Sequence, residues 1–322
     1  MRDGLRALDA LDLNLSQGNL LLLNLILGIV MFGVALGITT DDLRWVVRRP
    51  RTVLVGLVGQ LVLLPAATVA LVAVLHPWLT PGVAMGMILV SCCPGGNVSN
   101  FVVHLARGNA ALSVSLTAVT TAGAVLFTPL NFALWGGLYS RWMLTEAANP
   151  LLRTLEIDPL AVGQTVFLLL GFPLMLGMAF ARFAPNATAR IEAPIRIASI
   201  GLFAAIVVVA FGKNLDAFVA HIAFLFPIVL VHNALALSLG WGWAGAARLA
   251  RRERKAISIE VGIQNSGLGL VLLLNPAIFP PEVPIGGMAA IAAWWGIWHI
   301  LSGLTLASWW RREVPSSEPV AA

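Results

Sequence analysis

Charged side chains are scarce in this sequence. Only 11% of its 322 residues are Asp, Glu, Lys or Arg, whereas 59% are hydrophobic and the mean hydropathy is +0.89. Soluble domains are usually about a quarter charged, and disordered chains are poor in apolar residues, so the composition argues against both classes. It predicts a polytopic helical membrane protein, in which each span takes about 20 residues.

Cysteine is almost absent as well. Cys92 and Cys93 are the only two and are adjacent, so neither a disulfide framework nor a zinc site is predicted. Residues 1–17 contain three aspartates and no apolar segment after a basic start, so we expect a polar N-terminal segment rather than a signal peptide.

Apolar runs separated by breaking residues predict nine transmembrane helices. Their expected ranges are 18–40, 51–75, 82–107, 109–137, 160–182, 192–212, 218–247, 255–275 and 285–310. A single transporter domain would therefore cover residues 18–312, followed by a C-terminal tail at 313–322.

Basic residues are distributed unevenly among the predicted loops. Fifteen of the 20 Lys and Arg fall in alternate connections, which lie on one side of the membrane if there are nine spans. Because loops rich in Lys and Arg remain cytoplasmic, we expect the N-terminus outside and the C-terminus inside a cell (inner) membrane. Because the basic residues that give the net charge of +5 lie in these loops, the charge does not indicate nucleic acid as a partner.

The third predicted span is interrupted by the Pro-Gly-Gly sequence at 94–96. Proline removes a backbone donor and clashes with the preceding turn, and glycine lets the chain leave helical dihedral angles. A simple proline kink is the alternative, but it does not explain why Asn97, Ser99 and Asn100 follow directly. In lipid, such a break survives only where it is buried in protein or lines a cavity.

The eighth predicted span contains a carboxylate inside an apolar run. Glu260 is followed by Gln264 and Asn265, and an ionisable group within a span costs about 3 kcal/mol, so it usually marks function. Glu260 lies only five residues after Lys255, so an interfacial carboxylate is the alternative. The two neighbouring amides favour the functional interpretation.

The two interrupted spans occupy corresponding places, the third of the first four spans and the third of the last four. Such a pair is the sequence sign of an inverted-repeat secondary transporter, whose site lies where the breaks meet. The predicted fold is therefore an all-α inverted-repeat transporter with two broken crossing helices.

Oxygen atoms are the available donors near these breaks. They belong to Ser99, Asn100, Ser113, Thr117, Glu260, Gln264 and the freed backbone carbonyls. Hard cations take oxygen ligands, and one carboxylate among neutral oxygens suits a monovalent ion, so we expect Na⁺ as coupling ion and no other cofactor. A proton carried by Glu260 is the competing possibility. Gln60 in the second span is either a ligand or an interhelical hydrogen-bond partner.

Two segments closely resemble the signatures of the bile acid:sodium symporter family: CCPGGNVSNFVVHLARGNAALSVSLTAV and IEVGIQNSGLG. The resemblance continues through MFGVALGIT, GQLVLLPA, VLVHNALALSLG and IWHILSG, and thus covers nearly the whole chain in order. It implies sodium-coupled symport of an organic anion, bile-acid-like or a smaller carboxylate, by a core bundle that moves against a panel bundle.

The resemblance also implies a ligand set and a division of the chain. One sodium site would use Ser99, Asn100, Ser113, Thr117 and Glu260. A second would use Gln60, Glu260, Gln264 and the backbone carbonyls of Val261 and Ile263. The core would comprise 51–137 and 218–312, and the panel 18–40 and 160–212.

No Lys or Arg lies near the middle of a predicted span, so anion recognition is expected to rest on helix ends, Asn97, Asn265 and His299. The sequence departs from the family pattern at two of these places. Ile300 follows Trp-His where the family often has Asn, and Asn97 stands where Thr is usual. Both changes leave the choice among organic anions open.

Two other classes of protein remain as rivals. An intramembrane enzyme could combine Ser99, His104 and Glu260, but their spacing matches no hydrolase motif. A passive channel is disfavoured, because a site with many ligands tends to hold its ion. We therefore do not expect an enzyme.

Overall fold

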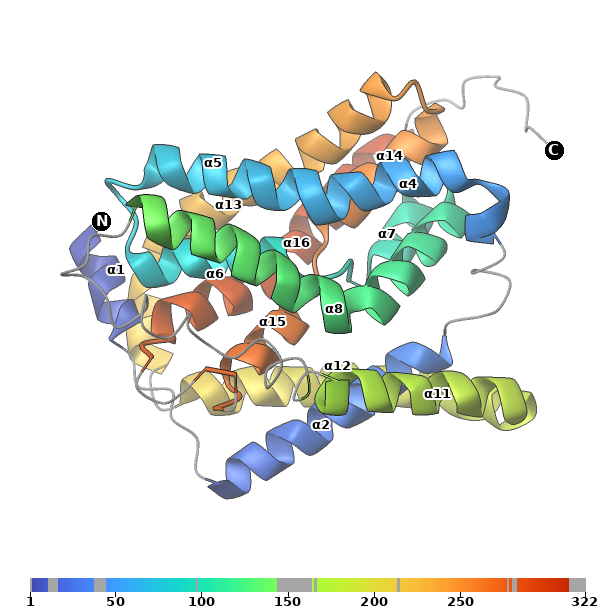
Figure 1. Cartoon of the computed structure of the whole chain (residues 1–322), viewed down its shortest axis with the longest axis horizontal. Helices are drawn as coiled ribbons and strands as arrows, with labels where there is room; N and C mark the ends of the chain where they lie inside the picture. Colours follow the sequence, from blue (N-terminus) through green and yellow to red (C-terminus); the bar gives the residue numbers. More distant parts are fainter. Residues whose placement is uncertain are drawn as a thin grey trace.

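The computed structural model describes residues 2–10, 17–37, 45–96, 98–143, 164, 167–212, 215–276, 278–279 and 283–312. The regular elements in these ranges are helices (Figure 1). Within this part, four helical stretches are long and apolar enough to cross a membrane: Pro50–Leu75, Ala110–Met143, His221–Ala246 and Gly286–Arg312.

Helices lie in the described parts of the ranges predicted as uninterrupted spans. These helices are α2 (Gln17–Leu36), α4 (Pro50–Val58) continued by the π-helical η1 (Gly59–Leu63) and α5 (Leu64–Leu75), α8 (Ala110–Met143), η3 (Phe167–Gly171) with α11 (Phe172–Phe183), α12 (Pro185–Gly212), α13 (Leu215–Ala246) and α16 (Gly286–Arg312). The number of membrane crossings stays a prediction.

Both predicted interruptions are present. The third predicted span consists of α6 (Pro81–Ser91) and α7 (Val98–Leu105), with non-helical backbone between them. The eighth consists of α14 (Arg251–Gly262) and α15 (Ser266–Leu273). All four pieces are too short to cross a membrane alone, because an α-helix rises about 1.5 Å per residue.

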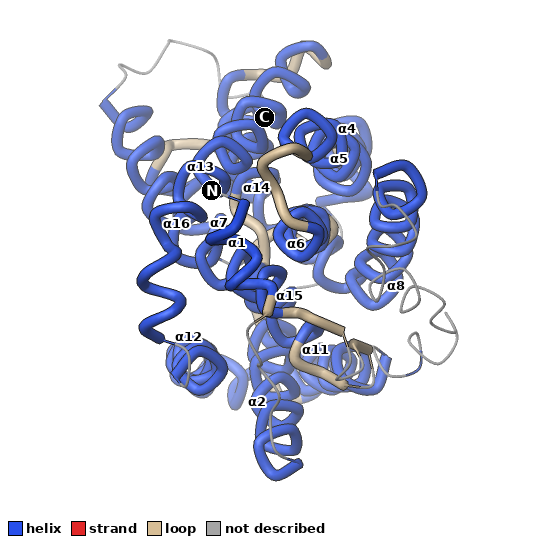
Figure 2. The backbone as a smooth tube through the Cα atoms, turned by 90° about the vertical axis from the view of Figure 1, so that its left-hand side faces the viewer, coloured by secondary structure: helices blue, strands red, loops and turns tan. Residues whose placement is uncertain are grey.

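The helices form two groups that Figures 1 and 2 show side by side. In one group, α2 packs against α11 and α12. In the other, α16 packs against α6, α7, α13 and α15, while α14 packs against α8 and α13. The interrupted helices thus lie within the larger group.

Apolar side chains cover parts of the outer surface. Leu126, Leu130 and Leu134 on α8 are each more than 60% exposed and lie one turn apart, so they form a single stripe. On α11, Phe172 and Leu176 form a similar stripe, with exposures of 54% and 52%. Such surfaces suit contact with lipid rather than water.

The N-terminal segment contains a helix that the polar composition of residues 1–17 did not predict. This helix, α1 (Arg2–Asp9), packs against α6, α13 and α16, and Leu5 and Leu8 are fully buried there. Eight residues span only about 12 Å, so α1 is a cap on the larger group and not an additional membrane span.

Candidate cation site at the crossing of two broken helices

The breaks of the two interrupted helices cross and pair with each other. Gly95 and Gln264 form an isolated antiparallel bridge. The Gly96 N–H donates to the Ile263 carbonyl at 2.8 Å, and the Asn265 N–H donates to the Pro94 carbonyl at 2.8 Å. Each break thereby satisfies backbone groups that the other has lost from its helix, as burial requires.

Glycine permits this close approach. A Cβ atom on Gly95 would lie 2.6 Å from Glu260 Oε2, and one on Gly96 would lie 3.1 Å from the Gln264 carbonyl oxygen. Any larger residue at Gly95 would displace either the carboxylate or the backbone. The glycines of the Pro-Gly-Gly sequence therefore have two effects. They let the backbone leave the helical conformation, and they leave space for the Glu260 carboxylate and the Gln264 backbone.

The Glu260 carboxylate is surrounded by hydroxyl groups. Glu260 is only 2% exposed, and its Oε1 accepts hydrogen bonds from Ser99 Oγ and Ser113 Oγ. Thr117 Oγ1 lies 3.1 Å from Oε1 and 3.0 Å from Oε2. These hydroxyls come from α7 and α8, so two helices converge on one carboxylate of α14.

Asn100 completes this group. Its Oδ1 lies 2.8 Å from Ser113 Oγ and 3.2 Å from Thr117 Oγ1. The five side chains predicted for a first sodium site are therefore brought together. Only Glu260 among them is ionisable, and all five offer oxygen, which is the donor chemistry of a hard monovalent cation.

Gln60 and Gln264 meet beside this group. Gln60 Nε2 donates to Gln264 Oε1 at 2.8 Å, and both residues are buried. With its amide turned by 180°, Gln60 instead donates to the Glu260 carbonyl oxygen at 3.0 Å and accepts from the Gly95 N–H at 3.3 Å. In either orientation it joins the second span to the breaks.

The helix around Gln60 is widened into a π-turn, η1, and Pro65 explains why. Proline has no N–H to donate and its ring clashes with the carbonyl four residues earlier, so the preceding turn expands. Single π-turns of this kind are frequent at functional sites.

The two carbonyls predicted as ligands are hydrogen-bonded. The Val261 carbonyl accepts from Gln264 Nε2 at 2.7 Å, and the Ile263 carbonyl accepts from the Gly96 N–H. Each carbonyl oxygen has two lone pairs, so one of them remains for a further partner. The second predicted set thus also lies together at the crossing.

The predicted substrate residues are less closely grouped. Asn97 lies outside the described residues. Asn265 is the N-cap of α15, and its side chain accepts from the Leu268 N–H at 3.0 Å. His299 on α16 is buried, and its Nδ1 has no hydrogen-bond partner among the described residues.

Sequence reasoning missed Asn233. On α13, Asn233 Nδ2 donates to the Gly262 carbonyl at 2.7 Å, and its Oδ1 accepts from Ser302 Oγ of α16 at 2.5 Å. Gly262 is the last residue of α14, so Asn233 satisfies a carbonyl that the break would leave orphaned. An amide inside an apolar span was the signal, the same one that identified Gln60.

Neither His104 nor His232 forms a catalytic group with Ser99 and Glu260. His104 lies near the C-terminal end of α7, whereas Ser99 is at its start. His232 is fully buried, with Nε2 2.8 Å from Thr68 Oγ1 and its ring against Trp295. Its contacts are those of a packing residue.

Comparison with known proteins agrees with the resemblance seen in the motifs. The profile of the Sodium Bile acid symporter family matches residues 24–221, more than half of the chain. The chain belongs to this family.

Relatives from bacteria, plants and animals align over most of its length. The sodium-dependent transporter YocS of Bacillus subtilis is 32% identical over 92% of this chain and 85% of its own. The probable sodium/metabolite cotransporter BASS1 of Arabidopsis thaliana is 32% identical over 90% of this chain and 66% of its own. The sodium-dependent organic anion transporter of Mus musculus is 28% identical over 87% of this chain and 70% of its own. The protein is accordingly a membrane transporter and not an enzyme.

Proposed function

We propose that this protein is a symporter that couples sodium entry to uptake of a small organic anion. The observation that supports the proposal most is the Glu260 carboxylate, buried among the hydroxyls of Ser99, Ser113 and Thr117. A first sodium ion would bind these oxygens together with Asn100. A second would bind Gln60, Gln264 and the carbonyls of Val261 and Ile263, with Glu260 between the two ions.

The helix ends at the crossing support binding of an anion beside the cations. α6 and α14 end at the breaks with carbonyl groups, and α7 and α15 begin there with N–H groups. Carbonyl ends favour cations and amide ends favour anions. Asn97, Asn265 and His299 would add hydrogen bonds to the substrate.

The two groups of helices supply the elements for alternating access. In this proposal α2, α11 and α12 form a panel, the remaining spans form a core, and movement of one against the other exposes the site to each side in turn. Nine spans related by an inverted repeat would place the basic loops in the cytoplasm and the N-terminus outside.

Sodium binding gives a direct test that needs no identified substrate. Sodium should raise the thermal unfolding midpoint of the purified protein when it replaces potassium at constant ionic strength, because a ligand of the folded state stabilises it. Glu260→Gln should abolish this response and also sodium-stimulated uptake of pyruvate or taurocholate into proteoliposomes. Glu253→Gln, on the same helix, should preserve both. Wild-type sodium dependence in Glu260→Gln would refute the site, and uptake driven by a pH gradient alone would identify proton coupling.

A matched pair on α8 tests the hydroxyl ligands. Thr117→Val keeps the shape of the side chain but removes an oxygen that contacts Glu260 and Asn100. Thr121→Val, one turn further, removes a buried hydroxyl whose oxygen has no partner among the described residues. We expect the apparent sodium affinity to fall about tenfold in the first variant only, since hydrogen bonds to charged groups contribute about 1.5–3 kcal/mol.

A further inference from the structure

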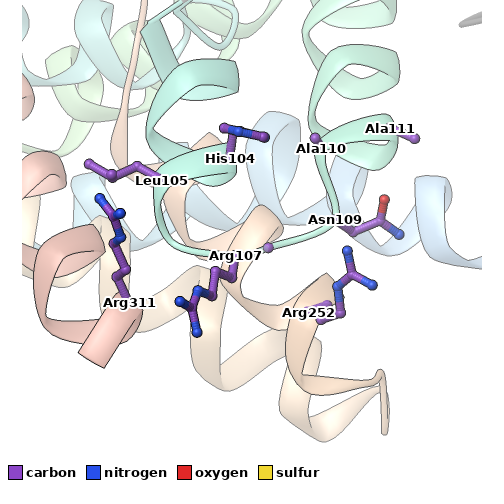
Figure 3. Close-up of a pocket in the computed structure, with 9 residues that line it drawn as sticks. His104, Leu105, Arg107, Asn109, Ala110, Ala111, Arg252 and Arg311 are labelled. Atoms are coloured by element: carbon purple, nitrogen blue, oxygen red, sulfur yellow. The ribbon is translucent and has the colours of Figure 1, made fainter. Parts of the chain in front are cut away.

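A cavity lined by basic residues lies at the opposite end of α7 from the break. There, α7, α8, α14 and α16 surround a cavity of about 610 Å³ (Figure 3). Three arginines from separate elements line it: Arg107 from the turn between α7 and α8, Arg252 from the start of α14, and Arg311 from the end of α16. None of the described residues that line the cavity is acidic.

The buried Lys255 holds two of these arginines in place. Its Nζ donates to the Ala106 carbonyl at 3.1 Å and to the Trp310 carbonyl at 3.3 Å. These residues directly precede Arg107 and Arg311. Lys255, which is 6% exposed, therefore joins the ends of α7 and α16 to α14. These hydrogen bonds fix the backbone positions from which Arg107 and Arg311 extend.

The third arginine is joined to the start of α8. The Asn109 N–H donates to the Arg252 carbonyl at 2.9 Å, and Asn109 Oδ1 caps the helix by accepting from the Leu112 N–H at 3.1 Å. Ala110 and Ala111, the first two residues of α8, line the cavity. The first N–H groups of a helix have no hydrogen-bond acceptor within the helix. The wall of the cavity thus combines guanidinium groups with the positive end of a 34-residue helix.

We propose that this cavity binds an anionic phosphate group. Guanidinium groups match phosphate oxygens with pairs of hydrogen bonds, and helix N-termini add further donors. The expected topology places the cavity on the cytoplasmic side, where such a group could come from the headgroup of an anionic lipid or from a soluble phosphate compound. The site is separate from the proposed sodium ligands, since it shares no residue with them.

The turn at Arg107 offers a conservative variant with a matched control. Arg107 has a left-handed backbone with φ of 57°, and the Gly108 N–H donates to the Val103 carbonyl, which ends α7 in a Schellman motif. Arg248, with φ of 56°, occupies the same position in the turn between α13 and α14 but does not line the cavity. Glycine favours this conformation, so Arg107→Gly and Arg248→Gly should both fold, and each removes one positive charge.

Binding is measured on the purified full-length protein at constant sodium concentration and ionic strength. The probes are dihexanoyl phosphatidylglycerol, dihexanoyl phosphatidylcholine and inorganic phosphate, and the readout is the thermal unfolding midpoint as a function of probe concentration. We expect phosphatidylglycerol to stabilise the wild type more than phosphatidylcholine does. Arg107→Gly and Arg311→Gln should each weaken the apparent affinity for phosphatidylglycerol about tenfold. Arg248→Gly should leave this affinity unchanged.

The outcomes separate the sources of the phosphate. Stabilisation by phosphatidylglycerol alone identifies a lipid headgroup, and stabilisation by inorganic phosphate at the same site identifies a soluble ligand. The proposal is overturned if neither probe stabilises the wild type, or if Arg107→Gly and Arg248→Gly lose affinity equally, because the effect would then be general surface charge.

Discussion

The break between α6 and α7 contains proline and two glycines and no carboxylate, whereas the break between α14 and α15 directly follows Glu260 and contains Gln264 and Asn265. The two segments are paired through the Gly96–Ile263 and Asn265–Pro94 backbone hydrogen bonds, yet they contribute differently to the site. The first is shaped to let another segment approach. The second brings the side chains that would bind the ions.

Capping of the half-helices shows the same difference. The N-terminus of α15 is capped by its own Asn265. The N-terminus of α6 has no side-chain cap from its own N-cap residue, Thr80, and instead the Gly82 N–H donates to Asp9 of α1 at 3.2 Å. At its N-terminus α6 therefore depends on a distant part of the chain, whereas α15 is capped by its own residue.

The largest effect should come from filling the space that the first break leaves. In Gly95→Ala, the new methyl group would lie 2.6 Å from a carboxylate oxygen whose partner oxygen is held by three hydroxyls. We expect sodium-stimulated uptake to fall at least tenfold. Gly137→Ala on α8, where a Cβ meets nothing within 4 Å, should leave uptake unchanged.

A double substitution sharpens this prediction. If the loss arises from contact with the carboxylate, shortening that side chain by Glu260→Asp should make the further addition of Gly95→Ala much less damaging. Measured uptake would then show positive coupling between the two positions. Independent, additive losses would instead mean that Gly95 matters only for its backbone conformation.

A smaller effect should follow from removing the support of the second break. Asn233→Ala leaves the Gly262 carbonyl buried without its donor, which costs about 1–3 kcal/mol. The thermal unfolding midpoint and the apparent sodium affinity should both fall. Asn131→Ala, which removes only an acceptor for Trp135 Nε1 on α8, is the control. An unchanged sodium affinity in Asn233→Ala would show that the second break holds its shape unaided.

Much of the candidate site could be predicted from the sequence because its members follow local rules. Ser113 and Thr117 are four residues apart on one helix and share a face. Glu260 is conspicuous as a carboxylate within an apolar run, and the Pro-Gly-Gly sequence marks the break that lies against it. These patterns depend on residues near one another in the chain.

What could not be predicted depends on packing between distant segments. The hydrogen bond from Asn233 to Gly262 requires the relative position of α13 and α14, which no local pattern determines. The burial of Leu5 and Leu8 requires a groove formed by α6, α13 and α16, and the low hydrophobicity of the segment concealed it. The arginine-lined cavity likewise arises from four helix ends whose loops were expected only to set orientation.

The smallest effect on transport concerns the distant cap of α6, which acts on stability alone and depends on pH. Burial raises the pKa of Asp9 from 3.8 to about 6, against the opposing hydrogen bond from the Gly82 N–H. Because the folded-state pKa lies above the unfolded one, the contribution of Asp9 to stability is fully present below about pH 4 and is lost as the pH rises through 6. The difference amounts to about 2–3 kcal/mol at most. In Asp9→Asn this dependence should disappear, so the midpoint of the variant should exceed that of the wild type progressively more from pH 4.5 to 7.5. A difference between the two proteins that does not vary with pH would mean that folding leaves the pKa of Asp9 unchanged.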